Sequence, residues 1–153
     1  MRKIDSIIVH CTATRADFMK NASNDDRVDE IRRWHVEDRG WSDIGYNYLI
    51  QRDGVINLGR DLDGDGNVDE EVGAHARGYN SHSIGISLFG GYASSADDQF
   101  SENFTPEQDA ALRSLISDLR KKYGDLKIMG HNEISNKACP GFNAMEWYTG
   151  EVA

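Results

Sequence analysis

The stretch Ile7-Ile8-Val9-His10 decides the fold, because three branched apolar residues in a row predict a buried strand that ends at a polar side chain. Two further apolar runs follow the same pattern. Ile84 to Phe89 predicts a strand closed by Gly90-Gly91, and Leu126 to Met129 predicts a short strand that leads into His131. A hairpin is also expected, since Tyr46 to Gln51 and Val55 to Leu58 flank the turn residues Arg52-Asp53-Gly54.

Two helices are expected between these strands. The first is predicted to run from the cap candidates Asn24-Asp25-Asp26 to about Asp38, with Gly40 as its stop and one face formed by Val28, Ile31, Trp34 and His35. The second begins at Thr105-Pro106-Glu107-Gln108, where Thr105 is an N-cap and Gln108 completes a capping box. It ends at Gly124, and its apolar stripe consists of Leu112, Leu115, Ile116, Leu119 and Tyr123. The pattern predicts an α/β fold.

Length and charge exclude several classes of protein. The 153 residues fit one domain, and two cysteines do not form a disulfide framework. The net charge is −9 and no block of Lys and Arg could follow phosphates, so nucleic acid is not an expected partner. The apolar run Ile7-Ile8-Val9 is far shorter than that of a signal peptide. We therefore expect a monomer that is made in the cytoplasm and does not insert into a membrane.

Three side chains are candidate ligands of one zinc ion, namely His10, His131 and Cys139. Two imidazoles and a thiolate are donors that zinc prefers, and three protein ligands leave open the coordination position that a catalytic site needs. His10 and His131 follow predicted strand ends, and Cys139 lies on a loop. Their spacing matches no short zinc motif, so spacing alone also permits structural roles. Cys11 is expected to be a buried thiol, because its side chain points away from that of His10 along a strand.

Six segments in order resemble the zinc N-acetylmuramoyl-L-alanine amidases of the phage-lysozyme and peptidoglycan-recognition-protein family. They are Ile8-Val-His-Cys-Thr-Ala-Thr14, Gly40-Trp-Ser-Asp-Ile-Gly-Tyr-Asn-Tyr-Leu-Ile50, Arg52-Asp-Gly54, Gly73-Ala-His-Ala-Arg-Gly-Tyr-Asn80, Ser83-Ile-Gly-Ile86 and Lys137-Ala-Cys-Pro-Gly-Phe142. The resemblance also includes Asn103 to Gln108 and runs from about Ile4 to Trp147. It is closest to the short phage amidase lysozymes.

The resemblance implies one amidase domain over residues 1–153, with a central mixed β-sheet flanked by helices and a zinc cleft above the sheet. It implies that His10, His131 and Cys139 bind the zinc, and that Tyr46 and Lys137 are catalytic. The implied reaction cleaves the amide between N-acetylmuramic acid and L-alanine in peptidoglycan.

The residues suit that chemistry. Zinc-bound water is a nucleophile near neutral pH, and a phenol or an ammonium group can stabilise the oxyanion that forms. Without the resemblance, Tyr46 would be interpreted as core packing and Lys137 as a solvated charge. His75 is expected on the substrate side of the cleft or behind the metal ligands. Asn47-Tyr48 departs from the His-aromatic pair common after this tyrosine, which puts substrate contacts there in doubt.

An acidic insertion at about residues 61–71 carries six acids and no base. Asp61, Asp63, Asp65 and Asp69 occupy positions 1, 3, 5 and 9 of a calcium loop, with Gly66 at position 6. The glutamate expected at position 12 is missing, and Glu70 or Glu71 is a candidate replacement. A solvated acidic turn is the alternative to a calcium site.

Three functional classes fit these observations to different degrees. The zinc amidase, acting as an endolysin, explains the open metal site together with Tyr46 and Lys137. Within this class, a cytosolic peptidoglycan-recycling amidase is the alternative to an endolysin. The other two classes are a non-catalytic peptidoglycan-binding module and a structural-zinc or redox protein that uses Cys11 and Cys139. No fourth zinc ligand and no Cys-x-x-Cys motif supports the last of these.

Overall fold

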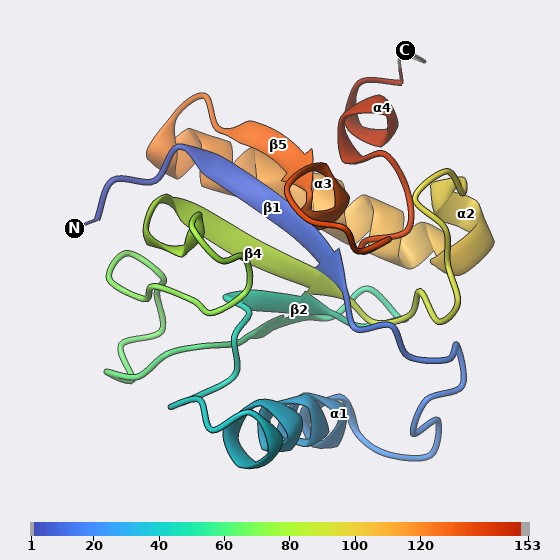
Figure 1. Cartoon of the computed structure of the whole chain (residues 1–153), viewed down its shortest axis with the longest axis horizontal. Helices are drawn as coiled ribbons and strands as arrows, with labels where there is room; N and C mark the ends of the chain where they lie inside the picture. Colours follow the sequence, from blue (N-terminus) through green and yellow to red (C-terminus); the bar gives the residue numbers. More distant parts are fainter. Residues whose placement is uncertain (1, 151–153) are drawn as a thin grey trace.

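Strand β1 (Ser6–Cys11) is an interior strand of the computed structural model, which describes residues 2–150 (Figure 1). It pairs in parallel with β4 (Ser83–Leu88) on one side and with β5 (Lys127–Gly130) on the other. Beyond β4, strand β2 (Tyr48–Ile50) is parallel to β4 and antiparallel to the edge strand β3 (Ile56–Leu58). The strand order is β3-β2-β4-β1-β5, which confirms the predicted mixed sheet.

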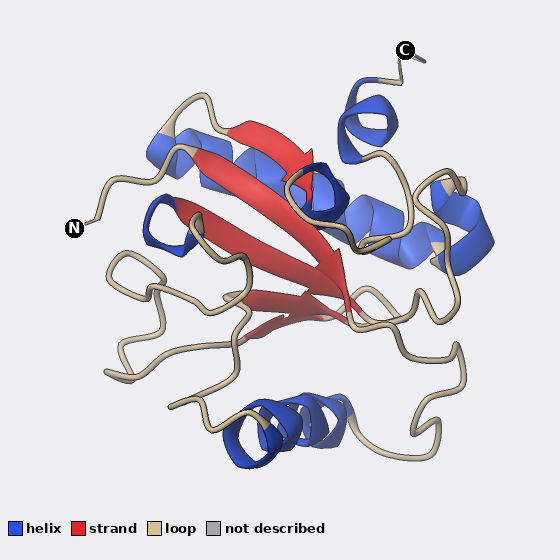
Figure 2. Ribbon diagram, in the orientation of Figure 1, coloured by secondary structure: helices blue, strands red, loops and turns tan. Residues whose placement is uncertain are grey.

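Helices cover both faces of this sheet (Figure 2). Helix α1 (Asn24–Arg33) packs on one face and continues as a π-helical segment, η1 (Trp34–Asp38). Helix α3 (Pro106–Tyr123) packs on the other face. The remaining elements are the short helices η2 (Asn80–His82), α2 (Phe100–Asn103), η3 (His131–Glu133) and α4 (Ala144–Thr149). Within residues 2–150, no helix combines the length and apolar character needed to cross a membrane.

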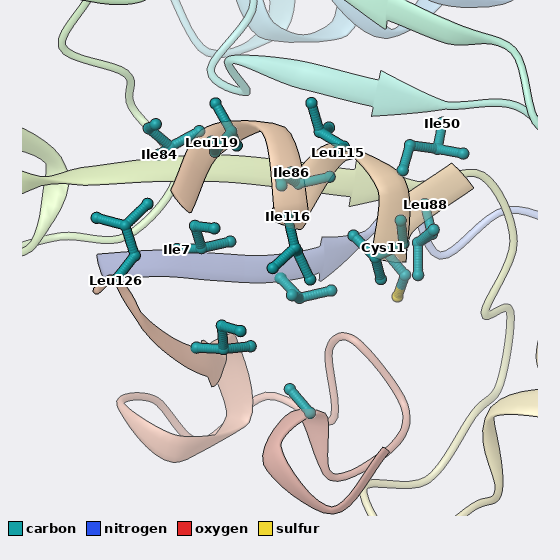
Figure 3. Packing of buried hydrophobic residues seen from close by; sticks show 14 of the residues in the cluster. Ile7, Cys11, Ile50, Ile84, Ile86, Leu88, Leu115, Ile116, Leu119 and Leu126 are labelled. Atoms are coloured by element: carbon teal, nitrogen blue, oxygen red, sulfur yellow. The ribbon is translucent and has the colours of Figure 1, made fainter. Parts of the chain in front are cut away.

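The alternation of side chains along β1 separates the core from the site. Ile7, Val9 and Cys11 belong to the core under α3, where they meet residues of the neighbouring strands and of that helix (Figure 3). Ile8 belongs to a different cluster, and His10 contacts other histidines, because successive side chains of a strand point to opposite faces. Cys11 is 5% exposed and lies in the core, as the strand pattern predicted.

The start of α3 is fixed by the predicted capping box. The hydroxyl of Thr105 accepts a hydrogen bond from the Gln108 amide at 3.1 Å, and the Gln108 side chain accepts one from the Thr105 amide at 3.0 Å. Gln108 is fully buried, and its Nε2 also donates to the carbonyls of Ile50 and Phe89. One side chain thus joins the start of α3 to the ends of β2 and β4.

Two predicted boundaries below differ from the structure, and two short helices were not predicted. The cap of α1 is Ser23, whose hydroxyl accepts from the Asp26 amide, so the predicted cap residues lie within the first turn instead. The strand predicted from Tyr46 begins as β2 at Tyr48. Helices α2 and α4 were not predicted, because each is too short to show an apolar period.

We expect Gln108→Ala to lower the free energy of unfolding by about 2 kcal/mol, since it removes the Gln108 half of the capping box and the buried hydrogen bonds that its Nε2 donates to the carbonyls of Ile50 and Phe89. Urea denaturation of the variant beside wild type measures the difference. Ser114→Ala, at an exposed position of α3, is the control and should change stability by less than about 0.5 kcal/mol. Equal stability of Gln108→Ala and wild type would contradict this role.

Candidate active site and metal centre

The pairing of β1 with β5 brings two of the predicted zinc ligands together. Val9 is the register partner of Gly130, so His10 and His131 follow at the carboxyl ends of adjacent parallel strands. Their ring centroids are 4.6 Å apart. Cys139 joins them from the loop after η3, with its Sγ 3.7 Å from His10 Nδ1. One donor atom from each residue lies within 4.8 Å of the other two.

The donor set fits a zinc ion. Zinc bonds of about 2.0–2.3 Å in a tetrahedral arrangement separate neighbouring ligand atoms by about 3.5 Å, which is close to the Cys139–His10 distance. Burial lowers the pKa of His10 well below its ordinary value, and burial followed by the charge of Lys137 lowers that of His131. Both imidazoles are therefore neutral at neutral pH, which is the form that binds a metal.

Backbone and side-chain contacts hold the Cys139 loop in place. The Cys11 amide donates to Cys139 Sγ at 3.2 Å. Asn132 donates from Nδ2 to the carbonyls of Ala138 and Phe142, on either side of the cysteine. Glu133 accepts a hydrogen bond from the Gly130 amide at 2.6 Å, so its carboxylate secures the start of η3 behind His131. These contacts hold the Cys139 thiol beside His10 and His131.

Tyr46 lies beside the ligands, with its ring centroid 5.3 Å from that of His10 and 5.4 Å from that of His35. Burial, followed by the nearby Cys139, raises the pKa of the Tyr46 phenol. The hydroxyl therefore keeps its proton at neutral pH. It can donate a hydrogen bond to an oxygen in the cleft, but it is poorly suited to act as a base.

A cleft surrounds these residues. Its inner part, of about 210 Å³, is lined by the three predicted ligands, Tyr46, Lys137, His75 and neighbouring residues. An outer hollow of about 500 Å³ shares Arg39, Trp41, His131 and Lys137 with it and extends past Arg77. Lys137 is exposed and lies where the inner part of the cleft meets the outer hollow. Among the described lining residues there are three cations and no carboxylate, although the chain carries a net charge of −9.

A family model described as N-acetylmuramoyl-L-alanine amidase matches residues 1–142. The endolysin of Klebsiella phage KP32 is 41% identical over 147 residues, which are 96% of this chain and 87% of the endolysin. The chain belongs to the N-acetylmuramoyl-L-alanine amidase family. It is a peptidoglycan-degrading amidase, which confirms the prediction of an enzyme over that of a binding module.

Solved structures agree with this family. The N-acetylmuramoyl-L-alanine amidase LysC from Clostridium intestinale URNW superposes with a TM-score of 0.72 at 28% identity, covering 97% of this chain and 85% of LysC. Peptidoglycan recognition protein-LE, solved with tracheal cytotoxin, superposes with a TM-score of 0.72 at 26% identity, covering 92% of this chain and 76% of that one. The similar structures therefore include an amidase and a peptidoglycan recognition protein, the two kinds of protein that the sequence resembles.

The other histidines of the amidase have distinct surroundings. His35 is buried, accepts a hydrogen bond from the Gly45 amide at 2.9 Å and packs against Trp41, so its contacts support the cleft wall. His82 lies 3.0 Å from a carboxylate oxygen of Asp5, near the surface. His75 is buried beside His10, and their ring nitrogens are 2.9 Å apart. A substrate contact of His75 stays a prediction.

Two features in and beside the cleft could not be foreseen from the sequence. Arg39 and Arg77 were not singled out, because a single exposed arginine on a loop has no periodic signal. Asn47 proves to be fully buried, with its side chain bonded to the Glu71 carbonyl and the Gly85 amide. The departure at this position therefore concerns the interior of the amidase, where Asn47 ties the acidic insertion to β4.

The acidic insertion brings together a different set of carboxylates from the predicted one. Oxygens of Asp61, Asp63 and Glu71 lie within 4.8 Å of one another. Asp69 instead accepts hydrogen bonds from Tyr123 and from Lys122, so it faces the end of α3. Glu71, which is 5% exposed, accepts a hydrogen bond from the Leu62 amide across the loop.

Proposed function

We propose that His10, His131 and Cys139 hold a zinc ion with which this amidase hydrolyses the bond between the lactyl group of N-acetylmuramic acid and L-alanine. The observation that carries the proposal is the convergence of their three donor atoms on the inner end of the cleft. The cleft leaves room beside them for a water molecule and a substrate carbonyl. A bound zinc would supply a nucleophilic water near neutral pH and polarise that carbonyl.

The chain's own side chains supply the remaining requirements of amide hydrolysis. Tyr46, protonated at neutral pH, donates a hydrogen bond to the oxygen that becomes negative when water adds to the carbonyl. Lys137 places a cation at the mouth of the inner cleft, where it attracts the same oxygen and can give a proton to the departing amine. The products are a carboxylate on the sugar and the free amine of the peptide.

The outer hollow suits the peptide side of the substrate. Arg39 and Arg77 give it positive charge, and Trp41 gives it an aromatic wall. Stem peptides of peptidoglycan carry free carboxylates, which such a hollow attracts. The recognition protein similar to this chain was solved with a monomeric diaminopimelic acid-type peptidoglycan, which supports a muramyl peptide as the substrate.

We further propose that the amidase acts on the cell wall as an endolysin, as its relative from phage KP32 is described. A cytosolic recycling amidase is the alternative. Intact sacculi and soluble muropeptides distinguish the two, because an endolysin must act on the polymer. Faster release of peptides from sacculi than from soluble fragments at equal bond concentration supports the endolysin, and the reverse order supports recycling.

The first prediction concerns the metal. The purified amidase should hold one zinc per chain, and Cys139→Ala should lose both the zinc and the release of stem peptides from sacculi. Metal analysis and mass spectrometry of the new ends, with and without a chelator, measure the two effects. His82→Ala is the control and should keep both the zinc and the activity, because His82 pairs with Asp5 near the surface and does not line the cleft. Full activity of the metal-free protein would refute zinc dependence.

The second prediction concerns the reaction. Tyr46→Phe and Lys137→Ala should each keep the zinc and the fold while lowering kcat by about 10²–10³, the usual effect of removing one donor to an oxyanion. Tyr92→Phe and Lys121→Ala change exposed residues outside the cleft and should keep wild-type kcat. If both cleft variants turn over at the wild-type rate, Tyr46 returns to a packing role and Lys137 to a solvated loop charge.

The third prediction concerns the acidic insertion, where we propose calcium binding by Asp61, Asp63 and Glu71. The amide of Asp65 lowers the pKa of Asp63, but the side chains of Asp65 and Asp61 raise it, to about 6 overall. One oxygen of Asp61 is buried without a hydrogen-bond partner. A hard cation would relieve this crowding of carboxylates.

Calcium should therefore raise the Tm of the wild-type amidase, since binding to the folded state stabilises it. The double variant Asp61→Asn, Asp63→Asn should lose the response, whereas Asp97→Asn, in another loop, should keep it. Calorimetry with calcium titrated at constant zinc measures the shift. The same calcium response in the double variant and in wild type would leave the insertion as a solvated turn.

A further inference from the structure

His75 connects one predicted metal ligand to the strand behind it. Its Nδ1 lies 2.9 Å from Nε2 of His10. The other nitrogen of His10, Nδ1, lies on the side of Cys139, 3.7 Å from Sγ. His10 thus faces the other ligands with one nitrogen and His75 with the other.

The hydrogen bonds beyond His75 fix the direction of each proton. The hydroxyl of Ser83 donates its single proton to the Tyr79 carbonyl at 2.7 Å. The oxygen of Ser83 must then accept from Nε2 of His75, which lies 3.3 Å away. His75 is 7% exposed, and none of its contacts among the described residues is with a carboxylate, so its ring is neutral and carries its one proton at Nε2. Its Nδ1 is therefore an acceptor, and Nε2 of His10 is the donor.

The surroundings of His75 allow one position of the ring. A Cβ on Gly85 would lie 2.4 Å from the ring, and a Cβ on Gly73 would lie 2.8 Å from it, so both positions exclude larger residues. Asn80 accepts hydrogen bonds from the amides of His75 and Ala76, at 2.9 and 2.8 Å. The rings of His75 and His10 meet edge to face, with centroids 5.0 Å apart.

We propose that His75, supported by Ser83, is a positioning residue that holds His10 in the tautomer whose Nδ1 is free to bind the metal. His75 is 7% exposed, and both of its ring nitrogens have partners within the protein, so it has little left to offer a substrate. The inference rests on the proposed zinc site. Loss of such a supporting partner typically weakens metal affinity by about 10–100-fold.

Zinc affinity, measured by competition with a chromogenic chelator, is the first test. His75→Leu, which has no acceptor, should weaken zinc binding by about 10–100-fold. His75→Asn, whose Oδ1 can replace the acceptor Nδ1, should restore most of the affinity. His82→Ala, a histidine that pairs with Asp5 instead, is the matched control and should bind zinc as wild type does. Wild-type affinity in His75→Leu would overturn the proposal, and so would equal weakening by Leu and Asn.

The second test needs no measurement of activity. In the zinc-free wild type at neutral pH, ¹⁵N NMR of the histidine rings should show His10 protonated at Nε2 and unprotonated at Nδ1. Ser83→Ala should then give a mixture of His75 tautomers, which a purely structural role for Ser83 would not produce. Protonation of His10 at Nδ1 in the wild type would overturn the proposal. Failure of the wild type to bind zinc would instead refute the proposed metal site, so the two failures are distinguishable.

Discussion

The parallel pairing of β1 with its two neighbours is the constraint on which the rest of the amidase depends. Parallel strands bring their carboxyl ends to the same edge of a sheet, and this edge is where open α/β sheets carry their chemistry. The register that pairs Val9 with Gly130 makes neighbours of His10 and His131, which are far apart in sequence. A slip of one residue would turn His10 towards α3 and Cys11 towards the cleft, so the same register holds the core and the site together.

The site places polar groups in a buried region, and the fold compensates for each of them. A buried imidazole without a partner would cost free energy. In this structure His10 lies between His75 and Cys139, and His75 lies between His10 and Ser83, so each ring nitrogen of the two residues has a neighbour. The same imidazole side chain therefore serves different purposes at neighbouring positions. His10 faces the other ligands, His75 supports it, and His35 accepts a bond from the backbone next to Tyr46.

The sequence was sufficient to predict those elements whose signals lie within a few neighbouring residues. The capping box at Thr105 and Gln108 and the branched run before His10 each lie within a few residues, and both are found in the structure as predicted. The resemblance placed His75 on the substrate side of the cleft or behind the metal ligands, but no local signal could decide between the two, because its position depends on a loop that returns to β4 and on two glycines that leave room for a ring. The pairing of Asp61 with Glu71, and of Asp69 with Tyr123, likewise depends on where the insertion crosses other elements. No spacing rule carries that information.

The acidic segment at about residues 61–71 is bonded closely to the residues beside the cleft. The amides of Arg60 and Ala74 donate to the carbonyls of Tyr46 and Gly45, so both flanks of the insertion are bonded to the segment that carries the cleft tyrosine. The Arg60 side chain reinforces this by donating to the carbonyls of Ile44, Asp43 and Val72. Since the entropic cost of a longer loop rises only slowly with length, a loop pinned in this way can grow at little expense. The segment therefore meets the cleft through the backbone of Gly45 and Tyr46, and its carboxylate group is separate from the three predicted zinc ligands.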